Sequence, residues 1–143
     1  MKLNSISPVS IPASIIRDYE FVSAIPSGEA FRLFEELAKF LYVAAQTITP
    51  LAPSPAIDAA WHDFILHTRA YQEYCTNNYH RLIHHSPERG LGVQNRGRYV
   101  ATIAALRHHF GEVDHHFWPH SESYLSEVCD SNCSGDSCDT GEK

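Results

Sequence analysis

Four stretches of the chain carry residues at the spacing of three to four positions that marks one face of an α-helix. Their face positions are, in chain order, Ile15, Tyr19 and Val22; Ala30, Phe34, Leu37, Leu41 and Ala44; Ile57, Trp61, Phe64, Thr68, Tyr71 and Cys75; and Tyr99, Ile103, Leu106 and Phe110. No convincing alternation of period two, the mark of a half-buried strand, occurs anywhere. The sequence therefore predicts an all-α fold, an irregular bundle of about four helices.

The third helix has the clearest start of the four. Ser54 can cap the free backbone amides of the first turn, and Pro55 suits the first helical position because no N–H is needed there. We expect one long helix from this point. Its end stays open, because weak helix formers at positions 76–78 let it stop anywhere from Cys75 to His80.

Composition suggests where the domain begins and ends. Residues 1–12 form a predicted N-terminal arm, residues 13–125 the helical domain, and residues 126–143 a disordered acidic tail rich in Ser, Asp, Gly and Cys. Within the domain, glycines and a proline predict a loop from Ser86 to Gly97. A short C-terminal cover from Val113 to Tyr124 is expected after the last helix.

The overall charge and the apolar runs exclude some classes of function. The formal net charge is −6, so the chain lacks the broad basic field that nucleic-acid binding requires. Its longest uninterrupted apolar run, Phe40 to Ala45, is far shorter than the roughly 20 residues that cross a bilayer. We therefore expect a cytoplasmic protein with neither a nucleic-acid nor a membrane partner. A protein partner stays open, as does the oligomeric state.

All ten histidines lie between His62 and His120. Asp58, one helical turn before His62, can hold one ring nitrogen and leave the other for a metal, a proton or a partner. An ordinary surface pair is the alternative. His84 and His85 are adjacent, and adjacent side chains of an extended segment point to opposite sides. At most one of them is therefore expected in any given site, and exposed loop histidines are the alternative for both.

Whether His84 reaches His62 depends on where the third helix ends. A straight helix from His62 to Tyr79 rises about 25 Å, whereas the five residues from His80 to His84 span at most about 18 Å. A helix that ends at Cys75 would let the two histidines meet. If the helix runs on, the return of the last helix would bring other histidines nearer His62 instead, namely His108, His109, His115 or His116, and would place His84 or His85 nearer Cys75.

The four cysteines fall into two groups with different expected roles. Cys75 lies on the apolar face of its helix and is expected to be a buried thiol. Cys129, Cys133 and Cys138 lie in the acidic tail, at a spacing that matches neither a zinc ribbon nor a zinc finger. Three thiolates can still bind Zn(II) or Cu(I) as a secondary site. Simple reactive thiols are the equal alternative.

Several short motifs acquire meaning when they are taken together. They are Leu51-Ala52-Pro53-Ser54-Pro55, Asp58-x2-Trp61-His62, Ile65-Leu66, Thr68, Tyr71, Cys75, Ile83-His84-His85 and Phe110-Gly111. With them the chain resembles the glycine-rich domain-containing protein-like family over about Phe31 to Pro119. It has only seven glycines, so the likeness covers the helical domain without the glycine-rich extension. Tyr79-His80 stands where such proteins usually carry Phe-Gly, which puts a tight turn there in question.

The resemblance implies an all-α fold but no reaction. It marks as motif positions Asp58, Trp61, His62, Tyr71, Cys75, His84 and His85. A nucleotide-binding loop, a dinucleotide fingerprint and a serine-hydrolase elbow are all missing, and no nucleophile for His62 can be identified. Whether the protein is an enzyme therefore stays open at this level.

The function that these residues favour is binding of a transition-metal ion, Zn, Fe, Ni or Cu, for metal handling or sensing. The expected ligands are some of His62, His84 and His85, with Asp58 behind them as the group that orients a ring. One alternative is a non-enzymatic interaction module whose aromatic and histidine-rich rim receives another protein. Another is a metal-dependent hydrolase or oxygenase, which needs an open coordination position beside a concave pocket.

Overall fold

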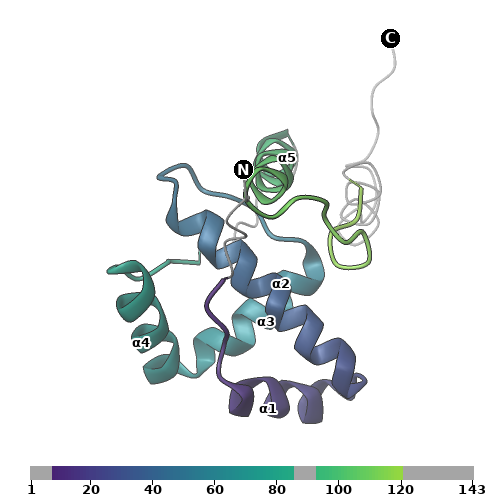
Figure 1. Ribbon diagram of the computed structural model, residues 1–143, viewed down its shortest axis with the longest axis vertical. Helices are drawn as coiled ribbons and strands as arrows, with labels where there is room; N and C mark the ends of the chain where they lie inside the picture. Colours follow the sequence, from purple (N-terminus) through teal and green to yellow (C-terminus); the bar gives the residue numbers. More distant parts are fainter. Residues whose placement is uncertain (1–7, 86–92, 121–143) are drawn as a thin grey trace, which may run out of the picture.

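The structure, a computed structural model, describes residues 8–85 and 93–120. This part of the chain holds five α-helices (Figure 1). They are α1 (Ala13–Ser23), α2 (Ser27–Ala45), α3 (Pro55–Leu66), α4 (Thr68–Tyr79) and α5 (Val93–Phe110). The described residues contain no strand, so the all-α prediction is confirmed. The bundle has one helix more than about four, because the long helix expected after Ser54 is two helices.

α2 is the central helix of the bundle. It packs against α1, α3 and α5, and α3 also packs against α4. Its buried side chains are Ala30, Leu33, Phe34, Leu37, Ala38, Phe40, Leu41 and Val43. This apolar surface is wider than a single narrow stripe, so α2 can bury itself against three neighbours at once. From α2, Phe40 meets Trp61 of α3 edge to face, with ring centroids 5.1 Å apart.

A break at His67 separates α3 from α4. The His67 backbone has φ −81° and ψ 67°, which lies outside the helical region and close to an inverse γ-turn. Hydrogen bonding continues on both sides, from the His67 N–H to the Phe64 carbonyl and from the Tyr71 N–H to the His67 carbonyl. The break turns α4 so that Tyr71, Tyr74 and Cys75 are buried. The prediction of one long helix is therefore wrong.

The ends of α4 and α5 agree with the sequence in part. α4 ends at Tyr79, and His80 adopts the left-handed conformation with φ 59°. The tight turn therefore forms although histidine occupies a position that glycine would fill without strain. α5 ends before Gly111, with φ 86°, as expected. It begins at Val93, so the loop predicted to reach Gly97 is too long, and packing of the helix outweighs the weak helix propensity of that glycine.

The segment before α3 is fixed by α5. The Ala52 N–H donates to Thr102 Oγ1 (3.1 Å), and the Thr102 hydroxyl lies 2.8 Å from the Ala52 carbonyl oxygen. Two residues later, Ser54 Oγ accepts a hydrogen bond from the Ile57 N–H (3.4 Å). The predicted start of α3 is thus confirmed. Because the capping segment is tied to another helix, the first turn of α3, which carries Asp58, has a fixed position.

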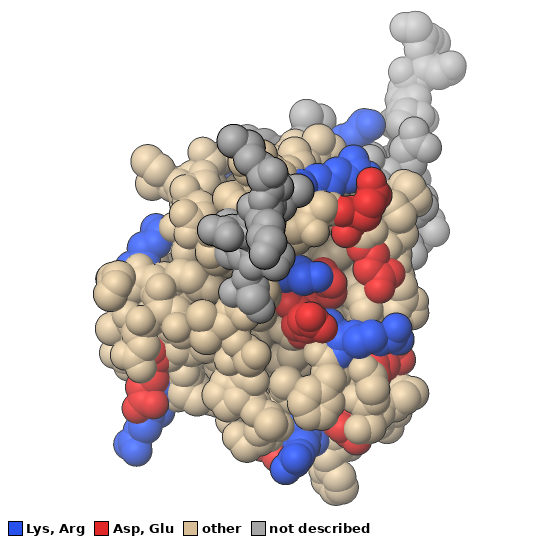
Figure 2. Space-filling model, in the orientation of Figure 1, with Lys and Arg blue, Asp and Glu red and all other residues tan. Residues whose placement is uncertain are grey.

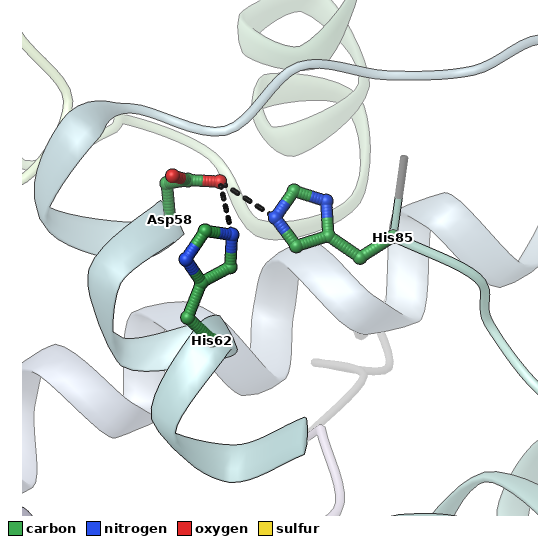
Figure 3. Close-up of side chains that lie close together, drawn as sticks. All are labelled: Asp58, His62 and His85. Atoms are coloured by element: carbon green, nitrogen blue, oxygen red, sulfur yellow. Dashed lines mark ion pairs between the residues drawn. The ribbon is translucent and has the colours of Figure 1, made fainter. Parts of the chain in front are cut away.

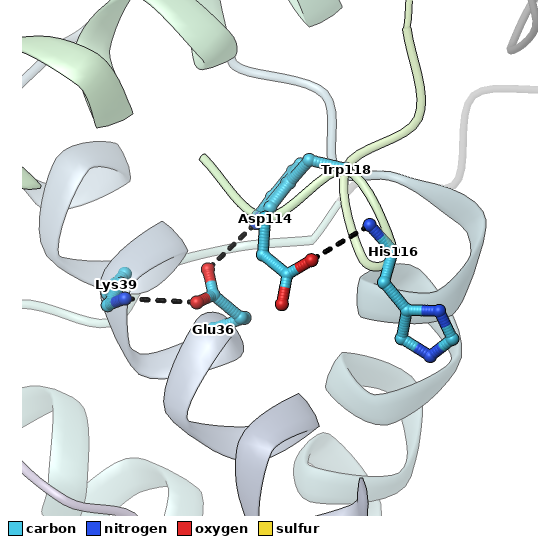
Figure 4. Close-up of polar contacts among 5 residues, drawn as sticks. All are labelled: Glu36, Lys39, Asp114, His116 and Trp118. Atoms are coloured by element: carbon cyan, nitrogen blue, oxygen red, sulfur yellow. Dashed lines mark hydrogen bonds and ion pairs between the residues drawn. The ribbon is translucent and has the colours of Figure 1, made fainter. Parts of the chain in front are cut away.

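A C-terminal cover closes the bundle beyond α5. Phe117 and Trp118 are buried, and the Trp118 indole N–H donates to Glu36 of α2 at 2.9 Å, a carboxylate that Lys39 also contacts (Figure 4). The predicted cover is present as far as the structure describes it. Tyr124 and the acidic tail with its three cysteines lie outside the described residues.

Charges are mixed on the surface of the bundle. On the face shown in Figure 2, basic and acidic side chains of the described residues lie next to one another, without a large area of one sign. None of the described helices combines the length and the apolar character that a bilayer-spanning helix needs.

Candidate metal centre

Three side chains from two segments converge beside the first turns of α3 (Figure 3). Asp58 and His62 lie one helical turn apart on α3, and His85 arrives from the extended segment that follows α4. A carboxylate oxygen and one ring nitrogen from each histidine all lie within 4.8 Å of one another. Asp58 Oδ1 is 2.9 Å from His85 Nε2 and 3.7 Å from His62 Nε2. Asp58, expected behind the histidines, thus lies within the cluster itself.

These separations suit a single metal ion. Ligand atoms at about 2.1 Å from a zinc ion lie about 3.0–3.4 Å from one another, depending on the coordination angle. The measured 2.9 Å and 3.7 Å fall on either side of that range. The two imidazole rings are tilted by 37° with centroids 4.4 Å apart. Because the three ligand atoms lie within 4.8 Å of one another, rotations of these side chains would bring the carboxylate and both rings to one ion.

His85 is the most constrained member of the cluster. Its side chain is only 10% exposed, against 51% for His62 and 38% for Asp58. Its ring stacks on the indole of Trp61, with centroids 4.2 Å apart and an interplanar angle of 11°. Its Nε2 is buried and makes no hydrogen bond, although Asp58 Oδ1 lies 2.9 Å away as an ion-pair partner. A buried polar atom without a partner is unfavourable, and a metal ion would satisfy this one.

A buried hydrogen-bond chain anchors the segment that carries His85. The Trp61 indole N–H donates to Tyr71 Oη at 3.0 Å, and the Tyr71 hydroxyl donates to the Ile83 carbonyl. Burial raises the pKa of Tyr71 above its ordinary value, so the donated proton stays in place. Trp61 therefore acts twice, since its face stacks on His85 while its N–H orients the tyrosine that holds the segment. Both side chains are buried, in keeping with their positions on one face of the predicted helix.

Replacing Tyr71 with phenylalanine should disturb both stability and the cluster. The Ile83 carbonyl and the Trp61 N–H would lose their partner, so we expect the free energy of unfolding to fall by about 1–3 kcal/mol. The affinity for added Zn²⁺ should fall about tenfold or more, because the segment bearing His85 loses its anchor. Urea unfolding and zinc titration measure the two effects. The matched control is Tyr79→Phe, since the Tyr79 hydroxyl is also buried but makes no hydrogen bond to the segment that carries His85. Equal losses in both variants would contradict the anchoring role.

His84 does not belong to the cluster. It is exposed, while its neighbour His85 is turned inward, as adjacent residues of an extended segment must be. Of the candidates on the last helix and the cover, His116 instead contacts Glu29 at 2.7 Å. His115 stacks on His120 with centroids 3.9 Å apart. Within the described ranges, only the Asp58 cluster brings three potential metal ligands this close.

The cysteines have separate places. Cys75 is fully buried, as expected for a core thiol, and burial raises its pKa above the ordinary value. A raised pKa keeps the group as a neutral thiol at pH 7, in a form that is a poor nucleophile and metal ligand. Cys129, Cys133 and Cys138 lie outside the described residues, so the secondary thiolate site stays a prediction.

A cleft of about 500 Å³ opens beside the cluster. Its described walls are the 47–53 segment and the 81–85 segment, with contributions from α2, α3 and α5. Asp58, His62 and His85 all line it. The volume lies in the range of pockets that bind small molecules. An ion held by the three side chains would therefore sit in the wall of a space large enough for a further ligand.

A second carboxylate of α3, which lies outside the cluster, should make the stability of the fold depend on pH. Asp63 Oδ2 is buried without a hydrogen-bond partner. Desolvation raises the Asp63 pKa above its ordinary value, an effect that His67 at 3.9 Å opposes and Asp18 adds to. A carboxyl whose pKa is raised by folding destabilises the fold when it is ionised. This penalty is absent below the unfolded-state pKa of about 3.9 and grows as the pH rises through the higher folded value.

Asp63→Asn should therefore stabilise the protein slightly at pH 7, by less than about 1 kcal/mol because solvent screens a group that is only partly buried, and the gain should disappear below about pH 4. Denaturant unfolding of both proteins between pH 4 and pH 8 measures the difference. If the variant were more stable by the same amount at pH 4 and at pH 8, the ionised Asp63 carboxylate would not be the cause of the difference in stability.

Comparison with known proteins identifies a family for this chain but does not indicate an activity. A family model described as UCP032817-like matches residues 13–116, which include all three members of the cluster and Trp61 and Tyr71. Neither the curated proteins nor the solved structures contain a match. The likeness to the glycine-rich domain-containing protein-like family is not tested by these comparisons and stays a prediction. Because the matched model covers more than half of the sequence, the chain belongs to the UCP032817-like family.

Proposed function

We propose that this protein binds a divalent transition-metal ion through Asp58, His62 and His85. The observation that carries the proposal is the convergence of the Asp58 carboxylate and the two imidazoles, in which the His85 Nε2 is buried and makes no hydrogen bond although Asp58 Oδ1 lies 2.9 Å away. A histidine packed only for stability would normally have its ring nitrogens paired or exposed. The stack on Trp61 and the tie through Tyr71 further support a ring held in advance for a ligand.

The ligand set favours some metals over others. Two imidazoles and one carboxylate suit Zn, Fe, Ni or Cu, whereas Mg and Ca prefer oxygen ligands alone. One carboxylate also leaves a divalent ion with a net charge of +1, which a further anion or hydroxide can balance. Three protein ligands leave at least one coordination position for such a group.

A metal-dependent hydrolase or oxygenase is the second candidate, and the cleft favours it. Catalytic zinc sites combine three protein ligands with an open position, and non-haem iron oxygenases use two histidines and one carboxylate. The cleft of about 500 Å³ supplies the concave space that either chemistry needs. Asp58, His62 and His85 would then hold the ion, while the reacting molecule occupies the cleft.

Titration of the full-length, untagged protein with Zn²⁺ and Co²⁺ tests the proposal. Cys129, Cys133 and Cys138 are changed to serine throughout, so that the tail contributes no thiolate. We expect one ion per chain and a visible cobalt spectrum that reports nitrogen and oxygen ligands. Both signals should be lost in the Asp58→Ala, His62→Ala double variant and retained in His108→Ala. Absence of saturable binding in the parent protein would refute the proposal.

A further inference from the structure

The charge of the cleft points to the kind of molecule it would bind. Among the described residues that line it, Asp58 is the only acidic side chain, while Arg81 and Arg98 are basic. This contrasts with the whole sequence, in which 17 acidic residues outnumber 11 basic ones. With Asp58 engaged by a metal ion, every remaining formal charge in this lining would be positive. An anion therefore matches the cleft better than a neutral or cationic molecule.

Arg81 is already held in a fixed position. Its Nη2 lies 3.0–3.2 Å from the carbonyl oxygens of Ala44, Ala45 and Thr47, at the end of α2. These contacts fix the guanidinium by one nitrogen. An arginine has five N–H groups, and those on Nε and Nη1 have no described protein partner. A fixed guanidinium with free donors is well suited to bind a carboxylate or phosphate.

Arg81 and the Asp58 cluster belong to the same cleft. Arg81 and His85 are four residues apart in the segment that follows α4, and both line the cleft. Four residues of extended chain span at most about 14 Å. The lining of the cleft also includes the apolar side chains of Phe40, Leu51 and Ile83.

Building on the proposed metal site, we propose that the cleft binds a small organic dianion. One oxyanion group ligates the metal held by Asp58, His62 and His85, and the other binds Arg81. A short apolar chain connects the two groups across the apolar lining. The shared chemistry is that of two carboxylate or phosphate groups joined by a short chain.

Dicarboxylates of increasing length are the probes for this inference. Succinate, adipate and suberate are titrated calorimetrically into the zinc-loaded protein, with butyrate, hexanoate and octanoate as the monoanions of equal chain length. We expect at least one dicarboxylate to bind about tenfold or more tightly than its monoanion, because a charged hydrogen-bond pair is added at Arg81. The preference should vanish in Arg81→Gln and persist in Arg107→Gln, whose arginine lies outside the cleft.

The outcomes separate this inference from the proposed function. If zinc binds at one ion per chain but every dicarboxylate binds no better than its monoanion, the dianion inference fails while the metal site stands. If zinc does not bind, both fail. Should Arg81→Gln not fold, because it also contacts the end of α2, the ratio of dianion to monoanion affinity in the parent protein decides alone.

Discussion

Replacing His85 with alanine is expected to lower the affinity for Zn²⁺ by at least about a hundredfold. The change removes the most buried of the three proposed ligands, and even the loss of a supporting group outside the ligand set costs about 10- to 100-fold. Trp61 would lose its stacking partner, yet the Tyr71 tie to Ile83 remains, so the fold should persist. Competition with a chromophoric chelator measures the affinity, and circular dichroism checks the fold.

His84→Ala is the matched control for this variant. The two histidines are adjacent and chemically identical, and differ in that His84 is exposed and outside the cluster. We expect His84→Ala to bind zinc within about threefold of the parent protein. The assignment would be contradicted if His84→Ala lost affinity as His85→Ala does, or if neither variant did.

Replacing Trp118 with alanine is expected to cost about 3–5 kcal/mol of the free energy of unfolding. Trp118 is fully buried, its ring lies 6.1 Å from that of Phe40, and its N–H donates to Glu36. The variant leaves a cavity against α2 and a part-buried carboxylate with one partner fewer. Urea denaturation measures the loss. Zinc affinity should change little in the fraction that is folded, because Trp118 does not line the cleft.

His116→Ala is the control for Trp118→Ala. It removes a surface contact of the C-terminal cover and leaves the buried side chains of the cover in place. The His116 ring touches Glu29 at 2.7 Å but is 59% exposed, so its removal should cost less than about 1 kcal/mol. A loss for Trp118→Ala no larger than that of His116→Ala would mean that the cover does not contribute to the core.

The sequence alone was enough to predict those helix ends that depend on interactions within one helical turn. Ser54 and Pro55 predict the start of α3, because capping and the missing proline N–H act within one turn. Gly111 marks the end of α5 for the same kind of reason. Asp58 and His62 are predictable neighbours, since the helix period alone brings them together.

The break at His67 could not be predicted in this way. Leu66, His67 and Thr68 include neither proline nor glycine, and hydrogen bonds continue through the break. What changes the direction is the burial of Tyr71, Tyr74 and Cys75, which is a property of the assembled core. A straight helix keeps His62 and the 84–85 segment too far apart, whereas the turned α4 brings His85 to His62 although it ends as late as Tyr79.

Which of His84 and His85 faces inward also could not be predicted from the sequence, because contacts between distant parts of the chain decide it. The period of an extended segment shows that only one of them faces inward, without saying which. The answer is set by the tie from Tyr71 to Ile83 and by the stack on Trp61, whose partners are 12 and 24 positions apart in sequence. Contacts over such separations leave no local pattern.

The metal content of the protein as purified tests the central claim most directly. The full-length chain is produced without a histidine tag and with serine at Cys129, Cys133 and Cys138, and transition metals are counted by elemental analysis. The account predicts about one ion per chain in this protein and a small fraction of that in the same protein with His62→Ala. Trace metal in both, or equal metal in both, would contradict it.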